Sequence, residues 1–429
     1  MIRKLIALPL AAQILLGLSA GAVVGLGLPG SGRVERVDEI VTVMAIGGQL
    51  WLRALQMTIL PLVFSLLSTL FIRTRGVASG GRTTRRALAV IFGLYLLGIP
   101  LGIISTYGLL WLFPITDEMA QALRAMAGEG IPPASVPWAE AILSVVPNNV
   151  VAAMSAGNLL PVLFFSIIFG AALAKLEEGR AKDILATGLA GLADVIFIVV
   201  NWVLRFAPVG VALLILPTVQ RHGADVFTGL AHNIAVSVAQ ILIAIAVVYF
   251  IAITAGRIPP VRFAKAMLPT QSVAVGTQSS TGCMPLTIKS CREMGISEAA
   301  IDATVPIAAV VFRFIAPWGF LITSIYAAEV YELPPLGIGT LIAIGLVGIL
   351  IEMSKVGLPA AATFLAAWAP MAALVGFPIE FVVVLLVVET IPDIFKTVLN
   401  VTAHATAAAL VDRRPTQFSS MEGSALLGR

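Results

Sequence analysis

The sequence predicts an all-α polytopic membrane protein with eight transmembrane helices and two re-entrant helical hairpins. Composition is the first observation: 59% of the 429 residues are hydrophobic, 12% are charged and the mean hydropathy is +1.00. A typical globular domain carries about twice this share of charged residues, and a soluble chain could not bury so much apolar surface. The second observation is the length of the apolar segments. The third is that two further apolar regions are interrupted by polar residues.

Eight apolar segments are long enough to cross a bilayer, which takes roughly 20 helical residues. They cover about 5–28, 43–72, 87–113, 141–174, 188–216, 229–254, 303–328 and 378–411. Several are longer than a bilayer requires, which predicts tilted helices. The first follows Arg3 and Lys4 as a signal peptide does, but its length favours a retained span.

The distribution of basic residues predicts the orientation. If the N-terminus is cytoplasmic and the hairpins do not cross, only Arg33, Arg36, Arg124 and Arg221 lie outside. Cytoplasmic loops are enriched in Lys and Arg, so both termini are predicted to be cytoplasmic in a bacterial-type cell membrane. The polar segment 412–429 is predicted to be a disordered cytoplasmic tail.

The two interrupted regions cover 258–292 and 335–375. The first has a polar centre from Thr277 to Gly282, and the second has Glu352 and Ser354 before Gly357. A broken segment followed by a full helix, occurring twice, indicates a midplane binding site in a secondary transporter. The N-termini of half-helices at such tips offer free N–H groups to an anion. The alternative is a pair of kinked ordinary helices whose Ser and Thr side chains bond back to the backbone.

The last apolar segment carries a polar stripe. A helix turns about 100° per residue, so one face about 80° wide holds five ionisable or amide side chains of its run 389–404. These are Glu389, Asp393, Lys396, Asn400 and His404, flanked by Thr397. Charges are costly in hydrocarbon, so this face must point into protein or a wet cavity, and intramembrane ionisable residues are usually functional. A structural pair between Asp393 and Lys396 is the alternative, although buried pairs stabilise poorly.

Several segments together resemble the dicarboxylate/amino acid:cation symporter family, which has the glutamate transporter fold. The resemblance covers nearly the whole chain. In the first half it includes "GGQLWLRALQMTILPLVFSLL" (47–67), "VVPNNVVAAMSAGNLLPVLFFSIIFGAAL" (145–173) and "VNWVLRFAPVGVALL" (200–214). In the second half, "QSSTGCMPLTIKS" (278–290) is similar to the serine-rich tip of the family's first hairpin, and "DIFKTVLNV" (393–401) to its D-x-x-R-T-x-x-N-V motif.

The resemblance implies a homotrimer that works by an elevator mechanism. Helices in 1–80 and 141–216 would form a fixed scaffold. The transport domain would comprise 85–113 and 225–411, including the hairpins at 258–292 and 335–375.

The resemblance also implies roles for the last helix. Asp393 would hold the substrate amino group, Asn400 its α-carboxylate, and Thr397 would lie beside them. Lys396 stands where the family has an arginine for the side-chain carboxylate, and it provides a point charge without the bidentate fork. An aspartate at 393 favours amino acids over plain dicarboxylates.

By the same resemblance, both hairpin tips would contact the substrate. Ser279, Ser280 and Thr281 match the serine tip that faces the α-carboxylate. Gly357 and Pro359 roughly match the flexible tip of the second hairpin, which serves as the gate.

The sequence departs from the family at its sodium motif. The family's N-M-D-G-T falls at Phe312-Arg313-Phe314-Ile315-Ala316, and its second aspartate after N-V is His404. Hard cations prefer oxygen ligands, so the family's sodium sites are not expected to survive intact. A weak site made of backbone carbonyls remains an alternative.

The same departure supplies residues that could couple transport to something other than sodium. Arg313 would act as a built-in cation or grip a substrate carboxylate, unless it pairs with Glu389 or Glu352. His404 is a candidate proton carrier because the reference pKa of histidine is about 6.5. Asp393 and Glu389 could also titrate if they are buried. We expect proton-coupled or ion-independent transport rather than sodium symport.

The prediction is therefore a secondary active transporter of a small anionic or zwitterionic substrate. It is not expected to be an enzyme, to hold a cofactor or metal, or to bind nucleic acid; two cysteines and three scattered histidines fit no metal-site pattern. A non-concentrative exchanger or channel and a non-transporting scaffold stay open as alternatives. A remote alternative is an intramembrane enzyme with Ser279 or Ser280 as nucleophile, which would need a base within reach.

Overall fold

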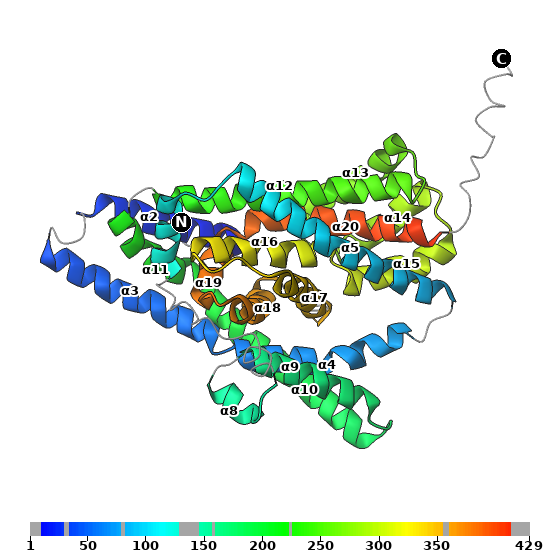
Figure 1. Cartoon of the computed structure of the whole chain (residues 1–429), viewed down its shortest axis with the longest axis horizontal. Helices are drawn as coiled ribbons and strands as arrows, with labels where there is room; N and C mark the ends of the chain where they lie inside the picture. Colours follow the sequence, from blue (N-terminus) through cyan, green and yellow to red (C-terminus); the bar gives the residue numbers. More distant parts are fainter. Residues whose placement is uncertain are drawn as a thin grey trace, which may run out of the picture. The chain divides into compact units, whose positions relative to one another are not determined.

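The computed structural model describes residues 10–29, 34–78, 82–127, 146–156, 159–222, 225–354 and 360–412 (Figure 1). Every regular element in these ranges is an α-helix. In chain order they are α2 (Leu10–Gly27), α3 (Glu35–Gln56), α4 (Ile59–Ala78), α5 (Arg82–Leu112), α6 (Asp117–Ala127), α8 (Val150–Ser155), α9 (Leu159–Lys175), α10 (Arg180–Arg205), α11 (Ala207–His222), α12 (Asp225–Thr254), α13 (Pro260–Thr277), α14 (Met284–Glu293), α15 (Glu298–Val311), α16 (Ile315–Val330), α17 (Ile338–Ser354), α18 (Ala360–Val375), α19 (Ile379–Val388) and α20 (Thr390–Val411).

Within the described ranges, five helical runs are long and apolar enough to cross a membrane. They are Arg82–Leu112, Arg180–Arg205, Phe227–Thr254, Glu298–Val330 and Ile391–Val411. Shorter apolar helices such as α9, α11 and α17 accompany them. The chain is therefore an all-α, multi-pass membrane protein, as its composition indicates.

Four segments that we expected to be single helices are each divided into two at residues that the structure describes, and the expected segment 141–174 likewise contains both α8 and α9. The divisions fall at Met57–Thr58, at Phe206, at 312–314 and at Glu389. In every case a proline occupies the second or third position of the helix that follows: Pro61, Pro208, Pro317 and Pro392. Proline has no N–H to donate, so it fits the first turn, where N–H groups have no intrahelical partner, and disfavours a helix continuing through it.

Both interrupted regions contain two helices, as predicted, and in the first of them a short turn joins the two. In the first, α13 begins at Pro260 and ends before Gln278, which is left-handed at φ 50° and ψ 31°. The turn leads into α14, which begins at Met284 with Pro285 next, and α13 contacts α14. In the second, α17 and α18 contact each other, and the tip between them lies outside the described residues.

The chain divides into two compact units, described here separately. Unit 1 comprises 1–76, 95–241 and 315–393, and unit 2 comprises 77–94, 242–314 and 394–429. In unit 1, α2 packs closely on α11 because three glycines repeat every fourth residue. A Cβ at Gly21 would lie 2.5 Å from the Ala212 carbonyl oxygen and one at Gly25 2.8 Å from that of Leu216, while Gly17 meets Pro208. Small residues at this spacing let membrane helices approach closely.

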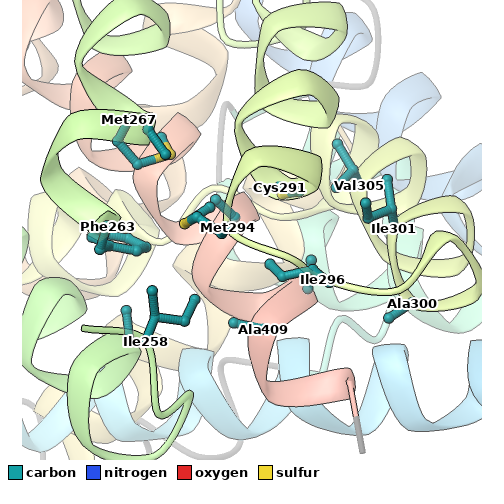
Figure 2. Close-up of a cluster of buried hydrophobic side chains, with 14 of the residues drawn as sticks. Ile258, Phe263, Met267, Cys291, Met294, Ile296, Ala300, Ile301, Val305 and Ala409 are labelled. Atoms are coloured by element: carbon teal, nitrogen blue, oxygen red, sulfur yellow. The ribbon is translucent and has the colours of Figure 1, made fainter. Parts of the chain in front are cut away.

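Unit 2 has an apolar core made by α13, α14, α15 and α20. Figure 2 labels Phe263 and Met267 of α13, Cys291 of α14, Ile301 of α15 and Ala409 of α20 among the buried side chains of this core. At the end of this core, Ser297 donates through its N–H (2.8 Å) and its hydroxyl (3.0 Å) to the carboxylate of Asp412. Asp412, which the sequence assigned to the tail, is thus hydrogen-bonded to the residue that precedes α15; residues 413–429 lie outside the described residues.

Candidate functional site

Unit 2 contains the turn between α13 and α14, the break after α15 and most of α20. These are the elements that carry the predicted substrate-binding residues other than Asp393, Gly357 and Pro359. Asp393 is the last residue of unit 1, although it lies on the same continuous helix, α20. Gly357 and Pro359 lie outside the described residues, so their predicted gating role stays a prediction.

The turn between α13 and α14 presents hydroxyl groups beside a helix N-terminus. Gly282 donates its N–H to Ser279 Oγ at 3.1 Å, and Cys283 donates its N–H to the Ser279 carbonyl at 3.1 Å. The side chains of Ser279 and Thr281 are exposed and that of Ser280 is half-buried. A hydroxyl that accepts one bond can still donate its proton. With the positive end of α14 next to it, the turn can bind a carboxylate.

The exposed Thr281 side chain also makes a hydrogen bond within the protein. Its Oγ1 donates to the backbone carbonyl of Ala309, near the end of α15, at 3.3 Å. Sequence reasoning assigned Thr281 to the substrate together with Ser279 and Ser280. In the structure its hydroxyl donates to the end of a neighbouring helix in the same unit, and its contact with the substrate stays a prediction.

The polar stripe of α20 is largely buried. The side chains of Thr397, Asn400 and His404 are buried, with exposed fractions of 4%, 6% and 0%, and Asp393 and Lys396 are half-buried. Asp393 donates its N–H to the Glu389 carbonyl at 2.9 Å, so helical bonding continues across the junction with α19. The predicted placement of these residues on one helical face is therefore kept, with Glu389 at the junction itself.

The side chain of His404 lies at the break between α15 and α16. Its Nε2 lies 2.7 Å from the carbonyl oxygen of Phe312. A carbonyl only accepts hydrogen bonds, so Nε2 carries the proton. The rings of Phe312 and Phe314 are fully buried, and the Phe312 ring lies 6.2 Å from that of His404. At these positions the residues offer phenyl rings and an N–H donor, which do not fit a sodium ion.

Arg313 lies between these two phenylalanines in sequence and is half-buried. Glu389 and Glu352, the two alternative partners considered above, belong to the other unit. Neither the salt bridge nor the role of a built-in cation is tested by the geometry of unit 2, and both stay predictions.

A second polar group, which sequence reasoning missed, joins three helices of unit 2. Gln271 of α13 donates through Nε2 to Thr402 Oγ1 of α20 at 2.9 Å, and its amide also bonds the hydroxyl of Tyr249 in α12. Thr402 in turn donates to the Val398 carbonyl at 2.7 Å. The group fixes α13, which leads to the hairpin tip, against α20. The three residues are far apart in the sequence, so no local spacing identified the group.

The helices of this membrane protein are divided near polar side chains, and a hydroxyl-rich turn faces a helix end. Both features are typical of secondary transporters. The family model of the sodium:dicarboxylate symporter family matches residues 10–414. The chain therefore belongs to the sodium:dicarboxylate symporter family. This is a family of transporters and not of enzymes.

Three relatives illustrate the range of the family. The chain is 25% identical to the proton/glutamate-aspartate symporter of Escherichia coli (strain K12), over 88% of this chain and 87% of that protein. It is 25% identical to the proton/sodium-glutamate symport protein of Bacillus caldotenax over 97% of each chain. It is 25% identical to the C4-dicarboxylate transport protein of Anaeromyxobacter sp. (strain K), over 71% of this chain and 67% of that protein.

Proposed function

We propose that this protein is a secondary active transporter of amino acids or dicarboxylates across the cytoplasmic membrane. It works by an elevator mechanism in a homotrimer, with both termini in the cytoplasm. Membership of the symporter family supports the class, and the relatives named for glutamate, aspartate and C4-dicarboxylates support the substrate range. Helices in 1–80 and 141–216 act as the scaffold, and 85–113 and 225–411 as the transport domain.

The substrate is held by α20 and the tip between α13 and α14. Asp393 accepts from the substrate ammonium and Asn400 binds the α-carboxylate, with Thr397 beside them. Lys396 pairs with a side-chain carboxylate, and the hydroxyls of Ser279 and Ser280 face the α-carboxylate. The burial of Thr397 and Asn400 supports these roles, because hydrogen bonds and charges act strongly only where water is excluded.

Transport is proton-coupled or ion-independent rather than driven by sodium. The observation that carries this proposal is the 2.7 Å bond between His404 Nε2 and the Phe312 carbonyl, flanked by two buried phenyl rings. A sodium ion needs several oxygen ligands in one place. Here one backbone oxygen already accepts a hydrogen bond from His404, and the side chains of Phe312, Phe314 and His404 contain no oxygen.

Separate ion gradients across proteoliposomes test the proposal. Uptake of radiolabelled glutamate, aspartate and a C4-dicarboxylate is measured with sodium and proton gradients imposed one at a time. We expect uptake of at least one of them in sodium-free buffer. An inward sodium gradient is expected to increase that uptake no more than about twofold. This is a small effect, because a free-energy difference of 1.4 kcal/mol corresponds to a tenfold change.

Strict dependence on sodium would contradict the coupling proposal while leaving transport itself intact. Uptake that never exceeds the external concentration under any gradient would indicate an exchanger or channel instead. Absence of any uptake from this substrate panel would contradict the substrate class.

A further inference from the structure

The carbonyl end of α15 lies beside the turn between α13 and α14 and beside α20. This helix ends at Val311, and the last carbonyls of any α-helix lack intrahelical partners and carry partial negative charge. In membrane transporters, such carbonyl ends of broken helices are where coupling cations bind. What occupies the carbonyls at this end therefore bears directly on coupling.

Side chains of the protein donate both to a carbonyl in the last turn of α15 and to the carbonyl of Phe312, the extended residue that follows the helix. Thr281 Oγ1, from the turn between α13 and α14, donates to Ala309 O at 3.3 Å. His404 Nε2, from α20, donates to Phe312 O at 2.7 Å. The same helix end thus holds both the hairpin tip and the last helix, and all three belong to unit 2.

Neither donor needs a charge to make its bond. The threonine hydroxyl is neutral, and His404 needs only the proton on Nε2 for its bond. Among the described residues His404 Nδ1 has no hydrogen-bond partner, and the side chain is fully buried. A proton on Nδ1 would be a buried donor without an acceptor, which is costly. The neutral tautomer with its proton on Nε2 is the form that fits this position.

We propose that Thr281 and His404 take the place of a coupling cation at the carbonyl end of α15 and hold the hairpin tip and α20 there without any ion. They are positioning residues: Thr281 orders the tip that carries Ser279 and Ser280, and His404 orders the stripe that carries Asn400. The inference deepens the proposed function, since it explains how the site stays assembled in the absence of sodium. It also separates Thr281 from the substrate contacts assigned to its two neighbours.

The first test replaces the donor of His404 and needs no transport. Purified His404→Asp offers a carboxylate that cannot donate to Phe312 O, and with that carbonyl it supplies two oxygen ligands for a hard cation. We expect His404→Asp to melt several degrees lower than the unmodified protein in choline chloride and to recover in sodium chloride at equal ionic strength. His404→Gln, whose amide N–H can still donate, is expected to melt close to the unmodified protein in both salts.

Two outcomes of this test would overturn the inference. One is a sodium-specific rise in the melting temperature of the unmodified protein. The other is a His404→Asp variant that melts like the unmodified protein in both salts, since the donor would then have no role. Neither result depends on finding the transported substrate, so they are distinguishable from failure of the proposed function.

The second test uses the exposed turn, where a variant is expected to fold. Thr281→Val removes the hydroxyl and keeps the shape, and Thr281→Ser keeps the hydroxyl. One hydrogen bond corresponds to about a tenfold change in affinity, so we expect Thr281→Val to raise the KM for uptake about tenfold with little change in kcat. Thr281→Ser should restore the KM. An unchanged KM in Thr281→Val, or a Thr281→Ser that fails to restore it, would contradict the positioning role.

Discussion

Asp393→Asn is expected to reduce the uptake of amino acids by about 100-fold or more and to spare the uptake of C4-dicarboxylates. Leaving a buried charge without its partner costs about 3–5 kcal/mol, and a tenfold change corresponds to 1.4 kcal/mol. The substrate ammonium would lose its anionic partner, whereas a dicarboxylate has no ammonium to lose. The measurement is kcat/KM for glutamate, aspartate and a C4-dicarboxylate in proteoliposomes.

Asp302→Asn is the matched control, because Asp302 is an exposed aspartate of α15 in a different part of the chain from the polar stripe. It should leave both classes of substrate unaffected. If Asp393→Asn reduced the uptake of amino acids and of dicarboxylates equally, Asp393 would support the structure of the site and would not hold the amino group.

Lys396→Met is expected to reduce uptake of every substrate with a second carboxylate by about 100-fold or more. The physical reason is again an unpaired charge in a half-buried position, now that of the substrate carboxylate. Lys396→Arg should keep uptake within about tenfold of the unmodified protein or improve it, because guanidinium adds a bidentate geometry that matches a carboxylate. The same kcat/KM panel, extended to neutral amino acids, provides the measurement.

Lys289→Met serves as the control for removing a lysine, since Lys289 is exposed on α14. If Lys396→Met reduced the uptake of neutral and acidic substrates alike, Lys396 would act on folding or on the movement of the transport domain. It would then not act on the side-chain carboxylate of the substrate. If Lys396→Arg lost uptake as completely as Lys396→Met, the site would require the smaller ammonium.

The parts of the fold that depend on local pattern were predictable. The stripe on α20 follows from the fixed turn of a helix, and Thr397, Asn400 and His404 are buried as that stripe requires. The hairpin at α13 and α14 was visible from Thr277 to Pro285. The four helix divisions were missed, because hydropathy responds to apolar length and a proline in the first turn of a new helix scarcely changes it. Pro61, Pro208, Pro317 and Pro392 were the available signal.

Contacts between distant segments were not predictable. Gln271 is hydrogen-bonded to Tyr249, which lies 22 positions before it, and to Thr402, which lies 131 positions after it. No spacing rule links these residues. His404 and Phe312 were each singled out as departures from the family pattern, but their mutual hydrogen bond depends on how α20 packs on α15. For Thr281 the tip was predicted and the direction of its hydroxyl was not. That direction is decided by the end of a helix 28 residues away.

The central claim is that the α13–α14 tip lies at the substrate. Substrate protection of a cysteine at Ser279 tests this most directly, with Ser272→Cys on the exposed face of α13 as the matched control. Both native cysteines are buried, so a maleimide added to the purified protein in detergent reports on the introduced thiol, and the unmodified chain gives the background. The account predicts that a transported substrate slows labelling of Ser279→Cys several-fold and leaves Ser272→Cys unchanged. Equal labelling of Ser279→Cys with and without a saturating transported substrate would contradict it.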